Sequence, residues 1–198
     1  MIEYRRAAEE DLPMIVDLHI ICFPDYFLTS LGKNLLYSFY KSFYDECNLF
    51  IVAYDNEKMI GFIMGQLDKS VARRNFEREN ALSLFFRLFW LCLRLDKEAL
   101  KRCKAKLFKK KSSGSQLTFS HQSDATGLSL GVLHEYRRKS VAARLMSEFE
   151  SLLKQYKVVS CTGSVRRENH KMQNFYIKNG YSIVEEASDS VRFLKNLE

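Results

Sequence analysis

The sequence predicts an α/β fold in which a mixed central sheet carries helices on both faces, and it predicts a single domain over residues 1–198. Three observations lead to this prediction. The chain has 198 residues, of which 46% are apolar, and this suits one domain with a sizeable core. Two apolar runs between residues 48 and 67 flank Asp-Asn-Glu-Lys, which indicates a hairpin. From residue 119 onwards, apolar runs of strand length alternate with amphipathic segments of helical period.

Each element follows from its local pattern. Residues 2–6 are expected to form a strand, and residues 9–22 a helix in which Pro13 comes early enough for its missing N–H to be tolerated. Pro24 and Asp25 break this helix, and a second helix is expected at 28–44. The remaining elements are strands expected at 48–54, 59–67, 119–133, 158–163, 181–185 and 190–194, and helices expected at 141–155 and 169–179.

Composition and charge narrow the function classes. The net charge of +7 comes largely from residues 97–111, which lack a nucleic-acid reading motif and interleaved stacking aromatics, so no nucleic-acid partner is expected. The five cysteines contain no CxxC pair, and their odd number and spacing indicate neither a disulfide framework nor a metal site. A reducing cytoplasm is therefore expected. No stretch of 18 residues lacks charge, so no stable membrane insertion is expected.

The most informative stretch joins a strand, a basic turn and a helix. The apolar run 127–132 is followed by the basic stretch from Arg137 to Ser140, which leads into the amphipathic segment 141–155. The first amides of a helix have no partner within the helix and carry the positive end of its dipole. The pattern therefore predicts a phosphate seat. It lacks both the Gly-Lys-Ser/Thr of a Walker loop and the three glycines of a dinucleotide fingerprint.

A second pattern lies at residues 169–181, which read Asn-His-Lys-Met-Gln-Asn-Phe-Tyr-Ile-Lys-Asn-Gly-Tyr. Met172, Phe175 and Tyr176 share one face of the expected helix. Gly180 is placed to end this helix before the next strand begins.

These two stretches together resemble the signature motifs of the GNAT N-acyltransferases. The acyl-CoA motif of that family is Arg or Gln, two residues, Gly, one residue, then Gly or Ala, and Arg137, Ser140 and Ala142 take these places. Residues 169–181 fall in register with the family's following helix. Two departures are His134, where Pro is common, and Ser140, where Gly is usual. A Ser supplies the same backbone amide provided that its φ is negative.

The resemblance implies a GNAT fold whose sheet splays at the acyl-CoA site, and an enzyme that transfers an acetyl or longer acyl group from acyl-CoA to a primary amine. It implies that Tyr176 is the catalytic acid for the leaving thiolate. It also implies that the backbone of the signature strand pairs with pantetheine and that the turn amides bind the pyrophosphate. The cofactor-binding residues implied in this way are Leu130, Gly131, Val132, Arg137, Arg138, Lys139, Ser140, Val141, Ala142, Ala143, Asn169 and Tyr176.

The amine acceptor follows from resemblance alone. Residues 23–32, Phe-Pro-Asp-Tyr-Phe-Leu-Thr-Ser-Leu-Gly, are similar to strings in GNAT proteins of bacterial surface-polysaccharide biosynthesis. This favours a nucleotide-linked (dTDP or UDP) amino-deoxy sugar, with Asp25, Tyr26 and Ser129 as substrate-binding residues. A protein or antibiotic amine and a non-catalytic CoA-binding module are the alternatives. The general base stays open among Asp25, Tyr26, His121, Asp124, Ser129 and Glu135.

Residues 71–111 lie outside the family pattern and are expected to be a helical, basic insertion. The segment 82–95 is nearly all apolar, broken by Arg87 and Arg94, so we expect a buried helix. Packing over the sheet or the acceptor groove, a homodimer interface and a membrane-surface helix are the alternatives. The membrane alternative is the least favoured, because two arginines make too narrow a polar face.

Overall fold

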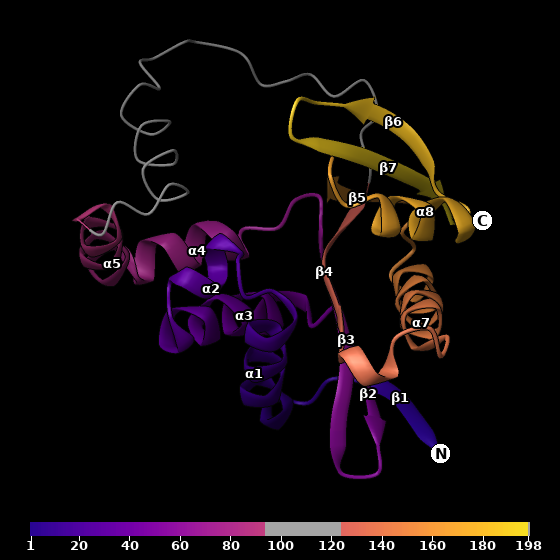
Figure 1. The fold of residues 1–198 in the computed structure, drawn as a ribbon, viewed down its shortest axis with the longest axis horizontal. Coiled ribbons are helices and arrows are strands. Elements are labelled where there is room, and N and C mark those ends of the chain that lie inside the picture. The colour runs from indigo at the N-terminus through magenta and orange to yellow at the C-terminus, as the bar shows by residue number, and fades with distance from the viewer. Residues whose placement is uncertain (94–123, 198) are drawn as a thin grey trace.

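Seven strands form one sheet in the computed structural model, which describes residues 1–93 and 124–197 (Figure 1). Their order across the sheet is β1-β2-β3-β4-β5-β7-β6. The β4–β5 pair is parallel, and the other neighbouring pairs are antiparallel. The strands are β1 (Ile2–Arg6), β2 (Phe50–Asp55), β3 (Lys58–Leu67), β4 (Ala125–Val132), β5 (Ser160–Arg166), β6 (Ser182–Glu186) and β7 (Ser190–Asn196).

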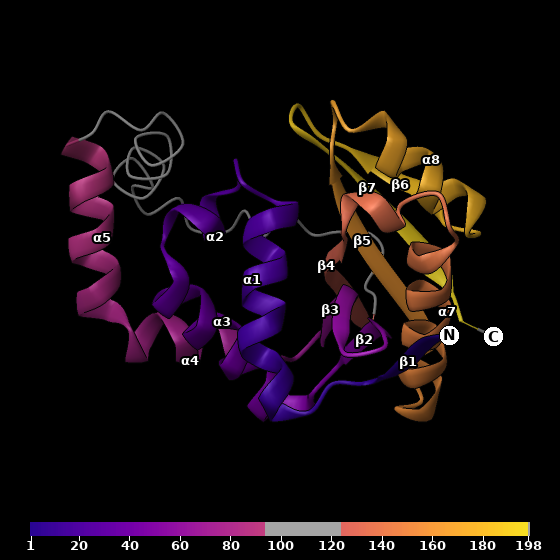
Figure 2. The same cartoon turned by 60° about the horizontal axis from the view of Figure 1, so that its bottom comes forward.

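Helices cover both faces of this sheet, as Figure 2 shows. On one face, α1 packs on β3 and β4, and α3 packs against α1. On the other face, α7 lies across β1 to β4, and α8 contacts β6. The described helices are α1 (Leu12–Cys22), α2 (Phe27–Ser30), α3 (Lys33–Cys47), α4 (Ala72–Glu79), α5 (Ala81–Leu93), α7 (Val141–Gln155) and α8 (His170–Lys178), with 3-10 turns η1 (Glu9–Asp11) and η2 (His134–Tyr136). This arrangement confirms the predicted mixed α/β fold.

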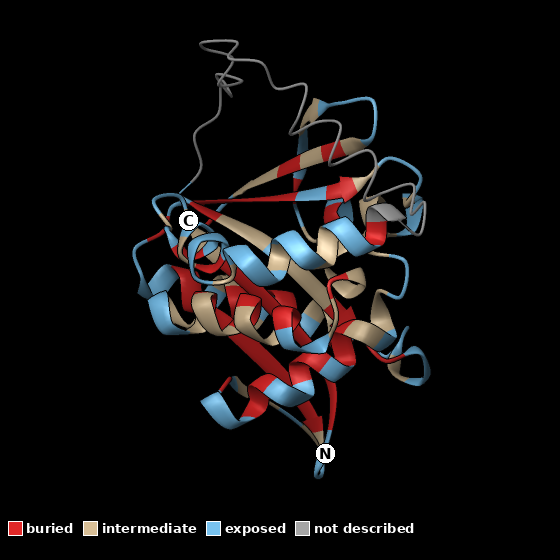
Figure 3. Ribbon diagram, turned by 90° about the vertical axis from the view of Figure 1, so that its left-hand side faces the viewer, coloured by how far each residue is buried: buried red, intermediate tan, exposed pale blue. Residues whose placement is uncertain are grey.

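The core lies between the sheet and the inner faces of the helices, where Figure 3 shows the buried residues in red. The largest fully buried side chains include Tyr40, Phe50, Phe62, Phe149 and Phe193. Tyr40 belongs to α3 and Phe149 to α7, which lie on opposite faces of the sheet, and Phe50, Phe62 and Phe193 belong to strands, whose successive side chains point to opposite sides. The sheet is therefore buried on both faces around its central strands.

A buried carboxylate fixes the start of the chain to the sheet. Asp11 is 2% exposed and accepts hydrogen bonds from Arg5 Nη1 at 2.6 Å, from Tyr54 Oη at 2.6 Å and from the Ala8 amide at 2.7 Å. Burial raises the pKa of Asp11, but the hydrogen bonds from Arg5 and Tyr54 outweigh burial and hold it below its usual value. Asp11 thus joins β1, β2 and the entry to α1.

The sheet splays between β4 and β5. These strands pair only from Ala125 to Gly127, opposite Cys161 to Gly163, although β4 continues to Val132 and β5 to Arg166. On its other edge, β4 stays paired with β3, with a register shift after Met64 that marks a β-bulge. The edge of β4 beyond Gly127 is therefore open on the β5 side, as the predicted GNAT fold requires.

Some element boundaries differ from the sequence predictions. The helix expected at 28–44 is divided into α2 and α3, because Gly32 has a φ of 92° that breaks the helical path. The helix expected at 9–22 begins with η1 and becomes α-helical at Leu12. Residues 119–123 of the expected strand, and residues 94–111 of the expected insertion, lie outside the described residues.

The expectation of a buried helix at 82–95 is wrong for burial within the described chain. In α5, Phe85, Phe86 and Phe89 are 62%, 66% and 58% exposed. Only a narrow face meets the rest of the protein: Leu91 is buried, and Arg87 donates from Nε to the Ser30 carbonyl oxygen at 2.9 Å. Leu84 is half-buried against the core, whereas the three phenylalanines point away from the rest of the described chain, because α5 stands at the edge of the molecule beyond α4 (Figure 2).

Candidate active site

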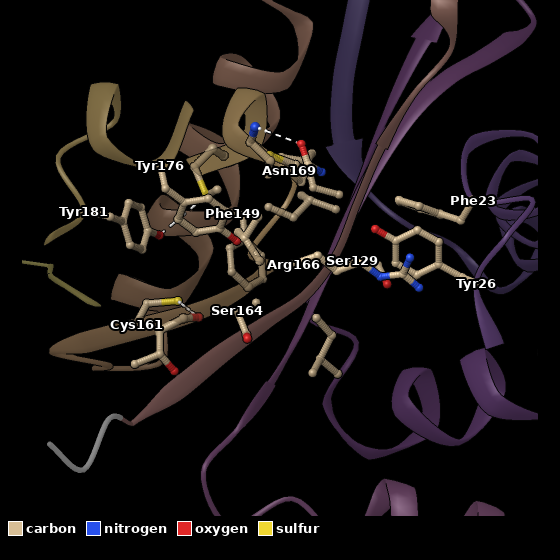
Figure 4. Close-up of a pocket in the computed structure, with 18 of the residues that line it drawn as sticks. Phe23, Tyr26, Ser129, Phe149, Cys161, Ser164, Arg166, Asn169, Tyr176 and Tyr181 are labelled. Carbon is tan, nitrogen blue, oxygen red and sulfur yellow. Dashed lines mark hydrogen bonds between the residues drawn. The ribbon is translucent and has the colours of Figure 1, made fainter. Parts of the chain in front are cut away.

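A cavity of about 190 Å³ lies where β4 and β5 diverge. Figure 4 shows Phe23 and Tyr26 on one side of β4 and Phe149 and Tyr176 on the other. The cavity therefore passes through the splay from the α1 face of the sheet to the α7–α8 face. The side chains of β5 and the start of α8 complete its wall.

The open edge of β4 presents backbone groups to this cavity. The Leu133 amide donates to the Ile60 carbonyl oxygen at 2.9 Å, so Leu133 faces β3. Because backbone groups alternate in direction along a strand, those of Val132 and Leu130 face the open side. By the same alternation, the backbone groups of Gly131 face β3, as those of Leu133 do. Of the predicted strand residues, the structure thus brings Leu130 and Val132, but not Gly131, to the open edge.

The predicted phosphate seat lies at the start of α7. The first intrahelical bond runs from the Arg144 amide to the Ser140 carbonyl oxygen at 3.0 Å. The amides of Val141, Ala142 and Ala143 therefore have no partner within the helix. The side chains of Arg137, Arg138, Lys139 and Ser140 are exposed in the preceding turn.

The backbone of this turn departs from the sequence prediction. Ser140 has a φ of 59°, whereas a negative value was expected, and Arg138 has a φ of 63°. The left-handed region costs a non-glycine residue about 1–2 kcal/mol. The turn adopts it because the chain must reverse between β4 and α7, and the Arg137 side chain holds this reversal by donating from Nε to the Val132 carbonyl oxygen at 3.2 Å.

Tyr176 lies at the α8 side of the cavity. It is 7% exposed, with its ring stacked on Phe193 at 5.1 Å and edge-on to Tyr181 at 4.9 Å between centroids. The ring lies over Gly163 of β5, where a Cβ would come within 2.6 Å of Tyr176 Cζ. Burial raises the pKa of Tyr176, so its hydroxyl remains protonated and is a hydrogen-bond donor at neutral pH.

Asn169 lines the same cavity as Tyr176 and also caps α8. Its Oδ1 accepts a hydrogen bond from the Met172 amide at 3.2 Å (Figure 4). The capping bond explains the residue type at this position.

The other end of the cavity is formed by an aromatic residue and an arginine from distant parts of the chain. The Arg166 guanidinium of β5 lies 4.0 Å from the ring centroid of Tyr26, which follows α1 (Figure 4). Ser129 also lines the cavity, whereas the exposed Asp25 does not. The structure therefore brings two of the three predicted substrate-binding residues together and adds Arg166, which the sequence analysis missed.

The carboxylates proposed as a general base do not line the cavity. Glu135 accepts a hydrogen bond from Lys58 Nζ at 2.9 Å on the surface. Asp124 accepts from the Val159 and Ser160 amides at 3.1 and 3.2 Å, at the paired start of β4 and β5. His121 lies outside the described residues. Within the described part of the chain, no carboxylate lines the cavity at all.

His19 of α1 is a cavity residue that the sequence analysis also missed. It is 2% exposed, and its Nδ1 lies 2.6 Å from Tyr40 Oη of α3. Its Nε2 has no hydrogen-bond partner among the described residues. Burial lowers the pKa of His19 from 6.5 to about 4, so the ring is neutral at neutral pH. The sequence did contain an indication of this residue: position 19 continues the apolar face of the expected helix, where a polar side chain is unusual.

The residues that the structure describes contain no group of three or more His, Cys, Asp or Glu side chains able to hold a metal ion. None of the described helices is long and apolar enough to cross a membrane.

Comparison with known proteins identifies the class to which this site belongs. The family model of the acetyltransferase (GNAT) family matches residues 12–181, so the chain belongs to that family. It is accordingly an acyl-CoA-dependent N-acyltransferase. No curated protein matches the sequence.

Solved structures share its fold at low sequence identity. The PaiA N-acetyltransferase of Thermoplasma acidophilum, solved in complex with coenzyme A, has a TM-score of 0.62 and 17% identity, and the match covers 99% of each chain. The ribosomal-protein-S18-alanine N-acetyltransferase of Escherichia coli has a TM-score of 0.61 and 13% identity, and the match covers 100% of this chain and 95% of that one. At these identities the similarity shows the fold.

Proposed function

We propose that this acyltransferase moves an acetyl or longer acyl group from acyl-CoA to the amino group of an anionic, ring-containing small molecule, of which a nucleotide-linked (dTDP or UDP) amino-deoxy sugar is the favoured class. The observation that carries the acceptor class is the cation–π pair of Arg166 and Tyr26 at one end of the cavity. It supplies a positive charge and an aromatic face together.

The open edge of β4 and the start of α7 fit an acyl-CoA. The backbone groups of Leu130 and Val132 are proposed to pair with the amides of pantetheine. The pyrophosphate is proposed to accept hydrogen bonds from the unpaired amides of α7. Hydrogen bonds to a charged group contribute about 1.5–3 kcal/mol each, so several backbone donors hold the diphosphate without one dominant side chain. Arg137, Arg138 and Lys139 add positive charge around it.

Tyr176 is proposed to donate a proton to the leaving sulfur. When acyl-CoA is bound, it supplies a thioester. Attack by a neutral amine forms the C–N bond and breaks the C–S bond, the thiolate takes the Tyr176 proton, and the proton that the acylated nitrogen loses restores the phenol, so the products are an amide and a thiol. A buried phenol that stays protonated at neutral pH is suited to this donation. The absence of a Cβ at Gly163 is what lets the phenol lie over β5 at the base of the splay.

The acceptor end favours an anion over a cationic peptide. Arg166 is half-buried beside Tyr26, and its Nη1 lies 3.9 Å from the exposed Glu168 carboxylate. Among the described residues that line the cavity itself, there is no carboxylate to attract a positive group. A nucleotide-linked amino sugar offers phosphates for the guanidinium and a base or sugar ring for the aromatic side chains. A protein amine is the alternative, since one solved neighbour is by its title a ribosomal-protein alanine acetyltransferase.

The test is a panel of amines assayed by thiol release from acetyl-CoA. It contains dTDP- and UDP-linked amino-deoxy sugars, peptides with free N-terminal or lysine amines, and aminoglycosides. We expect turnover with the nucleotide-linked sugars. We also expect Arg166→Gln to raise the KM for them about tenfold or more, through loss of a charge-assisted contact. Arg167→Gln is the matched control, because Arg167 pairs with Glu186 at 3.1 Å on the surface. If only the peptides are acylated, the acceptor is a protein amine and not a nucleotide-linked sugar, while the assignment as an acyltransferase stands.

Two further sequence predictions remain proposals. We propose a homodimer in which α5 contributes to the interface, since its exposed apolar residues include Phe85 and Phe89. We also propose that the enzyme acts in the cytoplasm, where acyl-CoA is available. Sedimentation at several concentrations tests the first, and fractionation of the native cell tests the second.

A further inference from the structure

We propose that His19 binds the amine that is acylated, with its Nε2 accepting a hydrogen bond from the amine N–H and thereby directing the nitrogen lone pair at the thioester. This proposal rests on the acyltransferase function above, and it names the group that positions the acceptor. It assigns the residue a contact with substrate rather than a role in folding alone.

The first argument is the orphaned nitrogen. His19 is 2% exposed and lines the cavity, yet its Nε2 has no partner among the described residues. Buried polar atoms in native proteins are almost always hydrogen-bonded, so an unpaired one that borders a cavity indicates a ligand that completes it. An amine in the cavity satisfies this requirement directly.

The second argument concerns the direction of the hydrogen bond. Nδ1 of His19 lies 2.6 Å from Tyr40 Oη. Burial raises the pKa of Tyr40, and the neighbouring Ser129 hydroxyl opposes that rise, which places Ser129 beside the phenol. Either atom of this pair can supply the proton, and the proposal assigns the imidazole proton to Nδ1, which donates to Tyr40 Oη. Nε2 then keeps a free lone pair, on a residue that lines the cavity.

The third argument is the composition of the cavity wall. An amine about to attack needs an acceptor for its N–H, and no carboxylate lines the cavity within the described ranges. Among the lining residues, His19 and Ser129 are neutral polar groups. The His19 ring lies 4.9 Å from that of Phe23, and Figure 4 shows Phe23 and Tyr26 on the side of β4 opposite Tyr176. Burial keeps the His19 ring neutral, so it orients a neutral amine without repelling an ammonium form that still has to lose its proton.

The chain offers a matched pair of substitutions for the test. In His19→Asn, the shorter amide reaches the place of Nδ1 and keeps the bond to Tyr40, but it leaves nothing at the place of Nε2. In His19→Gln, the longer amide reaches the place of Nε2. We expect the Asn variant to raise the KM for a dTDP-linked amino-deoxy sugar about tenfold and the Gln variant to stay within about threefold of wild type. Calorimetric acetyl-CoA affinity should be unchanged in both, since neither variant touches the β4 edge or the α7 turn.

The outcomes separate this proposal from the function on which it rests. Equal KM values for the Asn and Gln variants, or a wild-type KM for the Asn variant, would overturn the role of His19 while acyl transfer by the wild type stands. A wild type that binds acetyl-CoA but acylates no amine in the panel would overturn both. If the Asn variant fails to fold, ¹⁵N NMR of the wild type decides. Saturation with the amino sugar should shift the His19 Nε2 resonance, and an unmoved resonance would refute the contact.

Discussion

Acid should destabilise this protein through His19 between pH 6.5 and 4. The imidazole has a pKa of 6.5 in an exposed setting, and burial lowers it to about 4 in the folded chain. In this window the unfolded chain binds the proton and the folded chain does not, so the free energy of unfolding falls as the pH falls. The neutral His19 ring therefore makes its full contribution to the free energy of unfolding above pH 6.5, and this contribution is fully lost below about pH 4. The full loss is about 3 kcal/mol, since one pKa unit corresponds to about 1.4 kcal/mol.

Urea unfolding at pH 7 and pH 5, at constant ionic strength, measures this effect. Between these values the expected loss from His19 is about 2 kcal/mol. His19→Asn keeps the contact with Tyr40 but cannot titrate, so its free energy of unfolding should fall by about 2 kcal/mol less than that of the wild type. His134→Asn is the matched control, because His134 is exposed and its loss should leave the decline unchanged. Equal declines for the wild type and His19→Asn would refute the argument.

Three further substitutions test the site and the fold. Tyr176→Phe should lower kcat about 10²–10⁴-fold with acetyl-CoA affinity retained, because the hydroxyl acts as charge develops on sulfur; an unchanged kcat under rate-limiting chemistry would assign Tyr176 to packing. Ser140→Gly should stabilise the protein by about 1 kcal/mol in thermal unfolding, because the φ of 59° suits glycine, whereas Ser147→Gly inside α7 should destabilise it by about 1 kcal/mol; the same sign for both would show that Ser140 is not strained. Asp11→Asn should cost about 2–3 kcal/mol in urea unfolding, since it removes the charge held by Arg5 and Tyr54, and a loss within 0.5 kcal/mol, about the scale of a surface change, would contradict the stabilising role.

The sequence predicted best where local pattern and tertiary role agree. The helix expected at 141–155 has those same bounds as α7, because its apolar period, its basic start and its packing on β1 to β4 all require a helix there. The splay of the sheet was also predicted correctly, but by resemblance. No local pattern in β4 reports that β5 leaves it after Gly127.

The sequence predictions failed where a local pattern identifies an apolar helix face or a backbone preference but does not show how the rest of the chain packs around it. The apolar period of residues 82–93 correctly predicts a helix, but it cannot show that α5 meets the described part of the chain through a narrow face that includes Leu84, Arg87 and Leu91. Ser140 is similar, since its residue type favours a negative φ while the reversal between β4 and α7 imposes a positive one. In both cases a long-range constraint outweighs the local preference.

The site residues that sequence reasoning missed depend on contacts between distant segments. Arg166 and Tyr26 are 140 positions apart and meet because β5 leaves β4 and returns its end to the loop after α1. Gly163 shows the same dependence: a strand interior favours β-branched residues, and nothing local explains a glycine. The explanation is the Tyr176 phenol, which occupies the space that a Cβ would fill. A glycine in β5 and a tyrosine in α8 therefore form one unit, and the position of the proposed acid depends on both.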